Sequence, residues 1–551
     1  MSRLEIASPK KAKIVMEGLY KDLERRIESS PPGLCPVDMA RAFLELCHAQ
    51  TCGKCVPCRI GLGQLNNFIR EVLDGKATMK TLDIMEQTAL SIMESADCAI
   101  GYEAANMVYK GLIGYRDDYV EHIQNGRCTC TYNQPVPCVS LCPAHVDIPG
   151  YVALVGEGRY ADAIRLLRKD NPFPTTCGFI CEHPCEARCR RNMVDDSINI
   201  RGLKRVAADF AGEVDPPQCA PDTGKKIAIL GGGPGGLSAA YYLQLMGHQT
   251  TVYEMLPKLG GMLRYGIPNY RLPKDRLDDD IRAILKTGVQ VKNGLKIGQD
   301  ITIQQLRQEY DVVLITIGAS TDKKLGLENE DADGILSAVQ FLRNVGKNQI
   351  MDLTGKEVAV IGGGNVSMDA VRTAKRLGAK KVSIVYRRRV ADMTALPGEI
   401  DGAVAEGIEL QTLKAPSSID VDENHHVKGI YVTPQMVSSI RDGRASIKPT
   451  GEEDIYIPCD VLIVAIGQNI ETHHFEQAGI PVERGKIVTK STGAFENLPG
   501  VFAGGDCASG PASVIKAIAA AKVVAANIDE YLGYHHEISC DVDIPEAHLD
   551  D

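Results

Sequence analysis

No apolar run in the 551-residue sequence is long enough to cross a membrane. Val461 to Ile466 is short, and lysines interrupt Ile515 to Ile528, whereas a spanning helix needs about 20 mostly apolar residues in a row. The start, Met1 to Lys13, is basic but lacks an apolar run followed by a small-residue cleavage site. We therefore expect neither membrane insertion nor export, and hence a cytoplasmic protein.

The sequence also lacks a strong excess of charge of one sign. It has 61 Lys and Arg against 71 Asp and Glu, a net charge of −10, and the two signs alternate along most of the chain. A protein that binds nucleic acid or an anionic membrane usually carries a basic patch or run. Neither kind of partner is expected here.

Cysteine, in contrast, is abundant and uneven: 14 of the 18 cysteines precede residue 190, mostly in short-spaced groups. In a large chain without an export signal, close-spaced cysteines indicate metal ligands rather than disulfides. The first group is Cys52, Cys55 and Cys58, with Cys98 following after two expected helices, Ile60 to Asp74 and Thr81 to Met93. Three thiolates in one loop can hold three corners of a [4Fe–4S] cubane and a distant fourth can close it. Zinc is the alternative, because four thiolates also suit a tetrahedral ion.

A second, denser set holds eight cysteines. It consists of Cys128, Cys130, Cys138, Cys142, Cys177, Cys181, Cys185 and Cys189. Eight thiols suffice for two tetranuclear clusters, and adjacent cubanes can share ligands from both loops. Together with the first group they predict three [4Fe–4S] clusters, with disulfides as the alternative.

Behind a junction at Asp215 to Gly224, one pattern occurs twice, over Lys226 to Glu254 and over Glu357 to Arg387. Each copy has an apolar β run, a glycine cluster, a helix with small residues and a second β run. This order opens a dinucleotide-binding fold. The chain is therefore expected to bind two nucleotides.

The first glycine loop contains Gly231, Gly233 and Gly236 in the GxGxxG pattern, with Pro234 between them, and Glu254 ends its second strand. Glycine lets the backbone turn sharply and approach a pyrophosphate at a helix N-terminus. A carboxylate at the end of the second strand can accept hydrogen bonds from ribose hydroxyls. We expect a dinucleotide here; a tight turn without a ligand is the alternative.

The second loop contains Gly362, Gly364, Asn365 and Val366, and its second strand ends in arginines rather than a carboxylate. These are Arg387, Arg388 and Arg389. Guanidinium groups can pair with the 2′-phosphate of NADP, which a carboxylate would repel. The pattern therefore favours NADP(H) over NAD(H), unless the arginines only solvate a loop.

The last segment, Gly485 to Leu532, has a strand, a Gly-Gly turn and an Ala-rich helix, as in the closing part of a flavin domain. Asp506 follows the turn and is expected to reach the first nucleotide from its far side. The N-terminus of the helix, from about Pro511, would stabilise negative charge on a reduced flavin. Asp506 can also serve as a helix cap.

From about Cys128 to Leu532 the chain resembles the small subunit of glutamate synthase, the amino-terminal half of dihydropyrimidine dehydrogenase and the NADPH-binding large subunit of ferredoxin:NADP transhydrogenase. The resemblance rests on five motifs. They are Cys138-Val139-Ser140-Leu141-Cys142-Pro143, Asn171-Pro172-Phe173-Pro174, Gly260-Gly261-Met262-Leu263-Arg264-Tyr265-Gly266-Ile267-Pro268, Arg271-Leu272-Pro273-Lys274 and Gly362-Gly363-Gly364-Asn365-Val366-Ser367-Met368-Asp369. The resemblance implies two [4Fe–4S] clusters, FAD in the first nucleotide site beside Gly261, and NADP(H) in the second.

The same resemblance implies how the cysteines divide. One cluster would take Cys128, Cys130, Cys138 and Cys189, and the other Cys142, Cys181 and Cys185. Two positions depart from the family: C-x-C replaces C-x2-C at the start, and Lys204 stands where the family has a Glu or Gln ligand. An ammonium group has no lone pair to offer iron, so Cys177 is the nearest thiol that can substitute.

Residues Cys35 to His122 resemble the cluster-binding end of the flavoprotein subunit of respiratory NADH dehydrogenase and of multimeric hydrogenases. The matching motif runs from Cys52 to Arg59 and is completed by Cys98. The FMN- and NADH-binding portion of that family is missing. The resemblance implies an added cluster that passes electrons to a partner.

The expected fold is α/β with an all-α iron–sulfur front and two Rossmann-like domains, the NADP domain being inserted in the FAD domain. The expected bounds are 1–125 and 126–222 for the two helical cluster regions, 223–337 with 467–535 for the FAD domain, 338–466 for the NADP(H) domain, and 536–551 for an acidic tail.

The expected function is hydride transfer between a nicotinamide and FAD, followed by single-electron transfer through the clusters, with no catalytic acid or base. Tyr265 to Pro268 are expected to line the flavin. The favoured setting is an electron-bifurcating transhydrogenase, a hetero-oligomer with an NADH-binding flavoprotein, a small cluster subunit and ferredoxin. Alternatives are the glutamate synthase small subunit, an NADPH-linked subunit of a hydrogenase or formate dehydrogenase, and a cluster-carrying scaffold without turnover.

Overall fold

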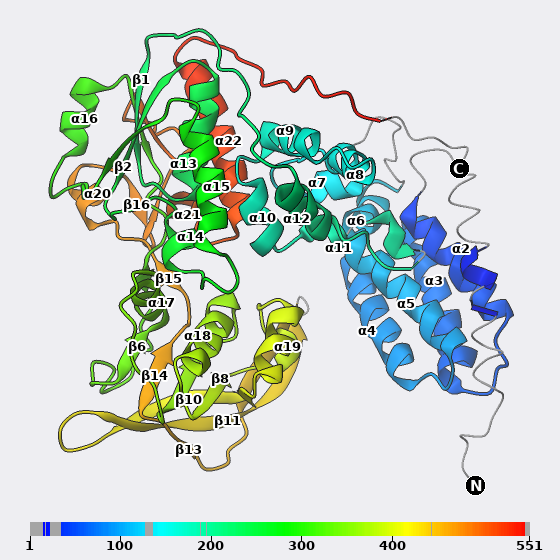
Figure 1. Ribbon diagram of the computed structural model, residues 1–551. Helices are drawn as coiled ribbons and strands as arrows, with labels where there is room; N and C mark the ends of the chain where they lie inside the picture. The colour runs from blue at the N-terminus through cyan, green and yellow to red at the C-terminus, as the bar shows by residue number, and fades with distance from the viewer. Residues whose placement is uncertain are drawn as a thin grey trace. The chain divides into compact units, whose positions relative to one another are not determined.

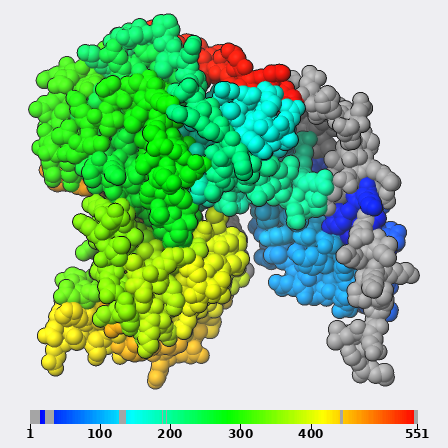
Figure 2. All heavy atoms as spheres, viewed as in Figure 1, coloured from blue at the N-terminus to red at the C-terminus, as the bar shows by residue number. Residues whose placement is uncertain are grey.

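The computed structural model describes residues 15–16, 18–21, 35–126, 136–187, 189–193, 195–441 and 444–545 (Figure 1, Figure 2). Its residues form two compact units, one from Met1–Cys142 with His183–Ile200 and the other from Pro143–Glu182 with Arg201–Asp551. Cys128 and Cys130, two of the expected ligands, lie outside the described residues. No described helix combines the length and apolarity that crossing a membrane requires.

The first unit is helical, as the sequence predicted for the front of the chain. Leu62, Leu65, Ile69 and Val72 recur at helical spacing and are fully buried, which places one face of their helix in the core. α5 packs against both α2 and α4. The helical elements are α2 (Pro36–Ala49), the π-helical turn η2 (Pro57–Gly61), α3 (Leu62–Leu73), α4 (Met79–Ser95), α5 (Ala99–Gly114), α6 (Arg116–Asn125), α7 (Pro137–Leu141), α11 (Pro184–Ala187) and the 3₁₀ turn η3 (Arg190–Met193).

The second unit begins with four helices and continues into two parallel sheets. The helices are α8 (Ile148–Gly156), α9 (Tyr160–Asp170), α10 (Pro174–Ile180) and α12 (Ile200–Phe210). α10 packs against α15 (Lys274–Leu285) of the following domain. Cys177, the cysteine of α10, is therefore held directly on the first nucleotide-binding domain.

The first sheet has five parallel strands in the order β18-β4-β1-β2-β3. β1 and β4 are almost wholly buried apolar runs, as expected for a parallel sheet covered on both faces. The strands are β1 (Lys226–Leu230), β2 (Gln249–Glu254), β3 (Gln290–Asn293), β4 (Val312–Ile315) and β18 (Val501–Ala503), and the helices are α13 (Pro234–Leu245), α14 (Met262–Tyr265), α15, α16 (Ile303–Glu309), α20 (His473–Gln477), α21 (Asp506–Ser509) and α22 (Val514–Tyr531).

The second sheet also has five parallel strands, in the order β6-β14-β7-β8-β9. An antiparallel sheet of β10 to β13 accompanies it. The parallel strands are β6 (Ile335–Ser337), β7 (Glu357–Ile361), β8 (Lys381–Tyr386), β9 (Glu409–Thr412) and β14 (Val461–Val464); the others are β10 (Lys414–Val421), β11 (Val427–Arg441), β12 (Arg444–Pro449) and β13 (Ile455–Pro458); the helices are α17 (Ala338–Gly346), α18 (Asn365–Arg376), the 3₁₀ turn η4 (Val390–Asp392) and α19 (Pro397–Ala405).

The chain leaves the first sheet after β4, builds the second sheet, and returns to the first sheet at β18. Two short strands, β5 (Thr321–Asp322) and β15 (Gln468–Asn469), pair where it crosses in each direction. This path confirms the expected fold class, with one dinucleotide-binding domain inserted in the other. β16 (Val482–Glu483) and β17 (Lys486–Ile487) form a small hairpin before β18.

Candidate cofactor sites

The first glycine loop joins β1 to α13, as the sequence predicted. Gly231 has a φ of +112°, and a Cβ at Gly236 would lie 1.9 Å from the Gly231 carbonyl oxygen. A Cβ at Gly261 would lie 2.7 Å from the Cα atom of Gly233. These glycines therefore let two loops approach each other where a phosphate would be expected, and the structure brings Gly231, Gly233 and Gly261 together.

Glu254 ends β2 beside this loop and is 5% exposed. Its Oε2 accepts a hydrogen bond from the Gly232 N–H at 2.7 Å, and its Oε1 accepts one from the Leu256 N–H at 2.8 Å. Burial raises the pKa of Glu254, and these backbone N–H groups act against that shift. The carboxylate lines a cavity of about 80 Å³ together with Gly231 and Phe475. Since each oxygen keeps a further lone pair, the site fits a group that presents paired hydroxyls.

Asp506 lies at the same edge of the sheet as the glycine loop, because it follows β18 as Gly231 follows β1, with β4 between them. Burial raises the pKa of Asp506 to about 6, and the N–H of Ala512 opposes the shift. The expected helix from about Pro511 begins later, at Val514, because the short α21 comes first. Asp506 is thus the first residue of α21.

The second glycine loop joins β7 to α18. A Cβ at Gly362 would lie 2.3 Å from the Ala465 carbonyl oxygen, so this position also requires glycine. Asn365 begins α18; its Oδ1 accepts the Leu396 N–H at 3.0 Å and its Nδ2 donates to Glu182 Oε1 at 3.2 Å. Gly364 and Val366 flank Asn365 in the same turn. The asparagine therefore ties the loop to two other segments.

The three arginines after β8 have different surroundings, which the sequence did not reveal. Arg389 donates from Nε and from a terminal nitrogen to Asp392, at 2.9 and 3.0 Å, and its hydrogen bonds hold the pKa of that carboxyl at about 2. Arg388 Nε donates to the Ala445 carbonyl at 2.9 Å. Arg387 is exposed and forms no ion pair within the part of the chain that the structure describes. It is therefore the arginine most available to an external phosphate.

A buried ion pair connects the two nucleotide-binding domains. Arg271 donates to both carboxylate oxygens of Asp369 on α18, at 2.9 and 2.8 Å, and its Nε lies 3.1 Å from Glu399 on α19. Burial raises the pKa of Asp369 to about 6, and the Arg271 charge acts against this. Both residues belong to motifs that the sequence analysis quoted, but the pair itself was not predicted, because nothing local marks a contact 98 residues apart.

The first cysteine group converges between η2 and the start of α5. Cys55 and Cys58 share a side-chain hydrogen bond, and burial, together with Cys55, Cys98 and Cys52, raises the pKa of the Cys58 thiol to about 12. Cys98 occupies the N-cap position of α5, without a side-chain hydrogen bond to the helix. A Cβ at Gly101 would lie 2.6 Å from Cys58 Sγ, so glycine leaves room for the thiol.

The spacing of these thiols bears on the choice between zinc and a cubane. Across the described residues, three ligand atoms from His, Cys, Asp or Glu lie within 4.8 Å of one another only at His248, Asp529 and His536. No three thiols of the first group are therefore drawn in as tightly as one tetrahedral ion requires.

The described members of the second cysteine set fall in both units. In the first unit, Cys138 lies on α7, and burial raises its pKa, as does the nearby Cys189; Cys142 and Cys185 are buried there too. In the second unit, Cys177 is fully buried on α10, and burial and the neighbouring Cys181 raise its pKa.

Lys204 is buried in the second unit, at 6% exposure, with its Nζ 5.7 Å from the centroid of the Tyr151 ring. Its charge acts to lower the pKa of Cys177, against the larger effect of burial. A buried ammonium group near a cluster can balance the cluster's negative charge. The ammonium group does not need to bind iron to have this effect.

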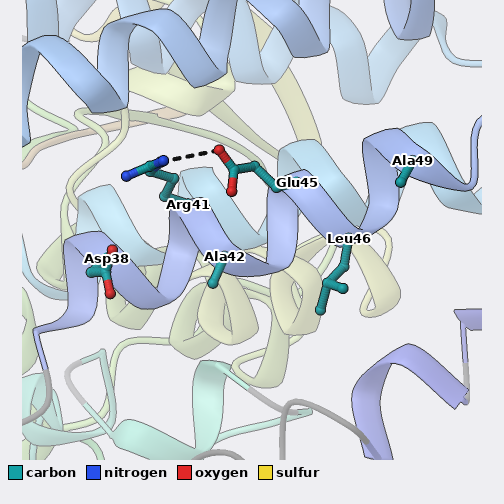
Figure 3. A pocket seen from close by; sticks show the side chains of 6 residues that line it. All are labelled: Asp38, Arg41, Ala42, Glu45, Leu46 and Ala49. Carbon is teal, nitrogen blue, oxygen red and sulfur yellow. Dashed lines mark hydrogen bonds and ion pairs between the residues drawn. The ribbon is translucent and has the colours of Figure 1, made fainter.

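The outer face of α2 has a hollow of about 380 Å³ (Figure 3). Arg41 Nε and Glu45 Oε1 form an ion pair there at 3.2 Å, and Leu46 and Asp38 also line it. None of its lining residues is a thiol, so no cofactor is assigned to it.

Three family models match the chain. Residues 225–521 match pyridine nucleotide-disulphide oxidoreductase, residues 38–122 match the NADH-ubiquinone oxidoreductase-F iron-sulfur binding region, and residues 114–215 match dihydropyrimidine dehydrogenase domain II, 4Fe-4S cluster. The chain thus belongs to the pyridine nucleotide-disulphide oxidoreductase family, with two iron–sulfur regions in front. This confirms the expected resemblances and the expected enzyme class, whereas the number of clusters stays a prediction.

Curated relatives are similar to most of the chain. The beta subunit of the NADP(+)-dependent formate dehydrogenase of Moorella thermoacetica is 32% identical over 89% of this chain and 79% of its own length. The beta subunit of the NADPH-Fe(3+) oxidoreductase of Geobacter sulfurreducens is 34% identical over 91% of this chain and 79% of its own length. The small chain of the Escherichia coli glutamate synthase [NADPH] is 33% identical over 72% of this chain and 88% of its own length.

Proposed function

We propose that this chain moves electrons between NADP(H), FAD and three [4Fe–4S] clusters as one subunit of a larger redox complex. The observation that carries the nucleotide assignment is the contrast between the two strand ends, a buried carboxylate at Glu254 and a free guanidinium at Arg387. A carboxylate suits an unphosphorylated ribose and a guanidinium suits a 2′-phosphate. The relatives whose names include NADP(+) or NADPH also support NADP(H) binding in the second site.

In this proposal FAD is held by the first glycine loop and its surroundings. The contacting residues are Gly231, Gly233, Pro234, Gly236, Glu254, Gly261 and Asp506. When bound, the flavin accepts or gives a hydride and releases electrons singly. The protein's part is to orient it: the glycines admit the pyrophosphate, the α13 N-terminus faces its charge, and Glu254 accepts from the ribose.

NADP(H) is held by the second loop and the end of β8. The contacting residues are Gly362, Gly364, Asn365, Val366, Arg387 and Arg388. Arg387 supplies the free charge for the 2′-phosphate, while the Ala445 carbonyl orients Arg388 through its Nε. The hydrogen bonds between Arg389 and Asp392 stabilise the turn that follows Arg387 and Arg388.

The proposed iron ligands form three sets. They are Cys52, Cys55, Cys58 and Cys98; Cys128, Cys130, Cys138 and Cys189; and Cys142, Cys181 and Cys185 with Cys177 as the substitute fourth thiol. Lys204 is assigned a charge-balancing role instead of a ligand role. The proposed domain bounds are those expected from the sequence, except that β6 (Ile335–Ser337) pairs with β14 and is therefore assigned to the NADP(H) domain.

Two settings for this subunit have specific support. The formate dehydrogenase and NADPH-Fe(3+) oxidoreductase beta subunits match 89% and 91% of this chain, whereas the glutamate synthase small chain matches only 72%. The larger coverage favours an NADP-linked dehydrogenase complex in which the first cluster receives electrons from, or gives them to, a partner. The resemblance to ferredoxin:NADP transhydrogenase keeps electron bifurcation as the second candidate; co-purification with an NADH-binding flavoprotein rather than a formate- or hydrogen-oxidising subunit would favour it.

The nucleotide assignment is tested by Arg387→Ala. We expect the KM for NADPH to rise by roughly tenfold or more, since a charge-assisted contact worth about 1.5–3 kcal/mol is lost, with the KM for NADH unchanged in steady-state dye reduction. Lys380→Ala is the matched control, because Lys380 is exposed just before β8, at its opposite end, and should alter neither constant. Equal rises for the two nucleotides would refute the assignment.

A further inference from the structure

A group of metal-binding side chains lies outside the cofactor sites, at the C-terminal end of α22. His248 and Asp529 are 0% and 2% exposed. His248 Nε2 lies 2.9 Å from Asp529 Oδ1, and His536 Nδ1 lies 2.8 Å from the same oxygen. These three ligand atoms all lie within 4.8 Å of one another.

Thr223 contacts the His248 ring at the nitrogen that does not face Asp529. The Thr223 hydroxyl lies 3.1 Å from the Gly247 carbonyl and 2.7 Å from His248 Nδ1, and the Lys225 N–H reaches the same hydroxyl oxygen at 3.3 Å. All three contacts are satisfied when Thr223 donates to Gly247 and accepts from the other two groups. His248 then carries its proton on Nδ1, and the Nε2 lone pair of the neutral ring faces the Asp529 carboxylate. Either a proton on Nε2 or a metal ion between the two atoms satisfies this 2.9 Å contact.

We propose that His248, Asp529 and His536 bind a divalent transition-metal ion of the zinc class. Two imidazole nitrogens and a carboxylate oxygen are ligands that zinc prefers. Thr223 acts as the outer partner that fixes the tautomer of a metal-binding histidine. The His536 side chain is 26% exposed, which gives the ion an entry path and leaves its fourth position to water.

Binding would move the side chains only slightly. Bonds of about 2.0–2.2 Å in tetrahedral geometry place ligand atoms roughly 3.3 Å apart, so the two nitrogen–oxygen separations need to lengthen by about half an ångström. The Asp529 Oδ2 atom remains bonded to the His536 backbone N–H at 2.7 Å. Asp529 therefore keeps its orientation while the ion replaces the shared protons.

The site is structural, because it lies at the opposite edge of the first sheet from the glycine loop. His248 precedes β2, whereas Gly231 follows β1, and in a parallel sheet these positions mark opposite edges. The ion would fasten the segment after α22, drawn in red (Figure 1), to the FAD-binding domain. Tyr534 stacks on His536 with ring centroids 5.6 Å apart. Further along the segment, the charge of Lys169 on α9 acts to lower the pKa of Cys540, against the larger effect of burial. Metal binding would thus hold a strap that runs from the flavin domain toward the cluster-bearing helices of the same unit.

The test uses the full chain, purified anaerobically with its clusters and flavin, treated with EDTA, loaded with zinc sulfate and desalted. We expect about one zinc per chain in the wild type and at least roughly tenfold less in His536→Ala, since losing a ligand or its support costs about 10- to 100-fold in affinity. His535→Ala is the matched control, because His535 is the exposed neighbour and should retain the ion. Iron and flavin contents should be equal in all three proteins, which excludes zinc at the cysteines.

Hydrogen exchange supplies a readout that does not depend on metal analysis. Zinc should slow exchange in residues 533–541 of the wild type and of His535→Ala and leave His536→Ala unchanged. A wild type that retains no zinc, so that protons alone hold the contacts, would overturn the proposal. Equal zinc binding by His536→Ala would overturn it too.

Discussion

At the residue scale, the three arginines that follow β8 have different partners. The sequence predicted that arginines follow β8, but Arg389 pairs with Asp392 and Arg388 donates to the Ala445 carbonyl, whereas Arg387 forms no ion pair with any described residue. That difference depends on Asp392 and Ala445, which lie outside the motif. The glycine positions were predictable, because backbone conformations with positive φ at Gly231 and Gly362 favour glycine over other residues.

Gly101→Ala should remove the first cluster without unfolding the front helices. The added Cβ would lie 2.6 Å from Cys58 Sγ and push that thiol out of position. We expect iron to fall by about four atoms per chain, measured by iron and acid-labile sulfide analysis with circular dichroism to check folding. Gly63→Ala is the control, since a Cβ there meets nothing within 4 Å; full iron content in Gly101→Ala would show that the cluster does not use Cys58.

Lys274 gives a prediction about pH. Its Nζ donates to the Leu263 and Ile267 carbonyls beside the expected flavin loop, and burial lowers its pKa to about 8 from 10.5. The unfolded chain therefore binds more protons than the folded one between these values, so Lys274 makes stability rise with pH in that window. From pH 7 to pH 9.5, the free energy of unfolding measured with urea should rise more in the wild type than in Lys274→Met. Lys258→Met, which changes an exposed lysine, should behave like the wild type. Parallel behaviour of Lys274→Met and wild type would refute this.

At the scale of elements, the sequence predicted both parallel sheets and two helices of the front module, which the structure forms as α3 and α4. It did not predict η2, the π-helical turn Pro57–Gly61 that precedes α3. Single π-helical turns are rare and occur mostly at functional sites, so helical spacing alone does not indicate them. The antiparallel strands β10 to β13 were also missed. β10 is mostly half-buried and β13 is mostly exposed, so these strands lack the continuous apolar runs that marked β1 and β7.

The contact between the two nucleotide domains depends on Arg271 and Asp369. Their side chains are 11% and 5% exposed, and Arg271→Gln leaves the Asp369 carboxylate buried with less compensation. We expect a loss of about 3–5 kcal/mol in the free energy of unfolding, measured by urea titration. In the double variant Arg271→Gln with Asp369→Asn, most of this loss should be recovered; additive losses would show that the two residues do not act as a pair.

At the scale of the whole molecule, the chain joins three kinds of domain that occur separately in other families. Two nucleotide-binding domains are interleaved in sequence, and in the proposed function their cofactors exchange hydride. The cysteine regions offer sites for one-electron carriers. In the proposed function no catalytic acid or base is expected, because the protein contributes orientation and charge and the cofactors contribute the chemistry.

The most direct test of this account is metal and sulfide analysis of anaerobically purified chain, followed by NADPH titration under electron paramagnetic resonance. The account predicts about twelve iron and twelve sulfide per chain, with cluster signals that NADPH induces and that disappear when the flavin is removed. Protein with cysteine-bound zinc and no acid-labile sulfide, or with full clusters that NADPH cannot reduce through the flavin, would contradict it.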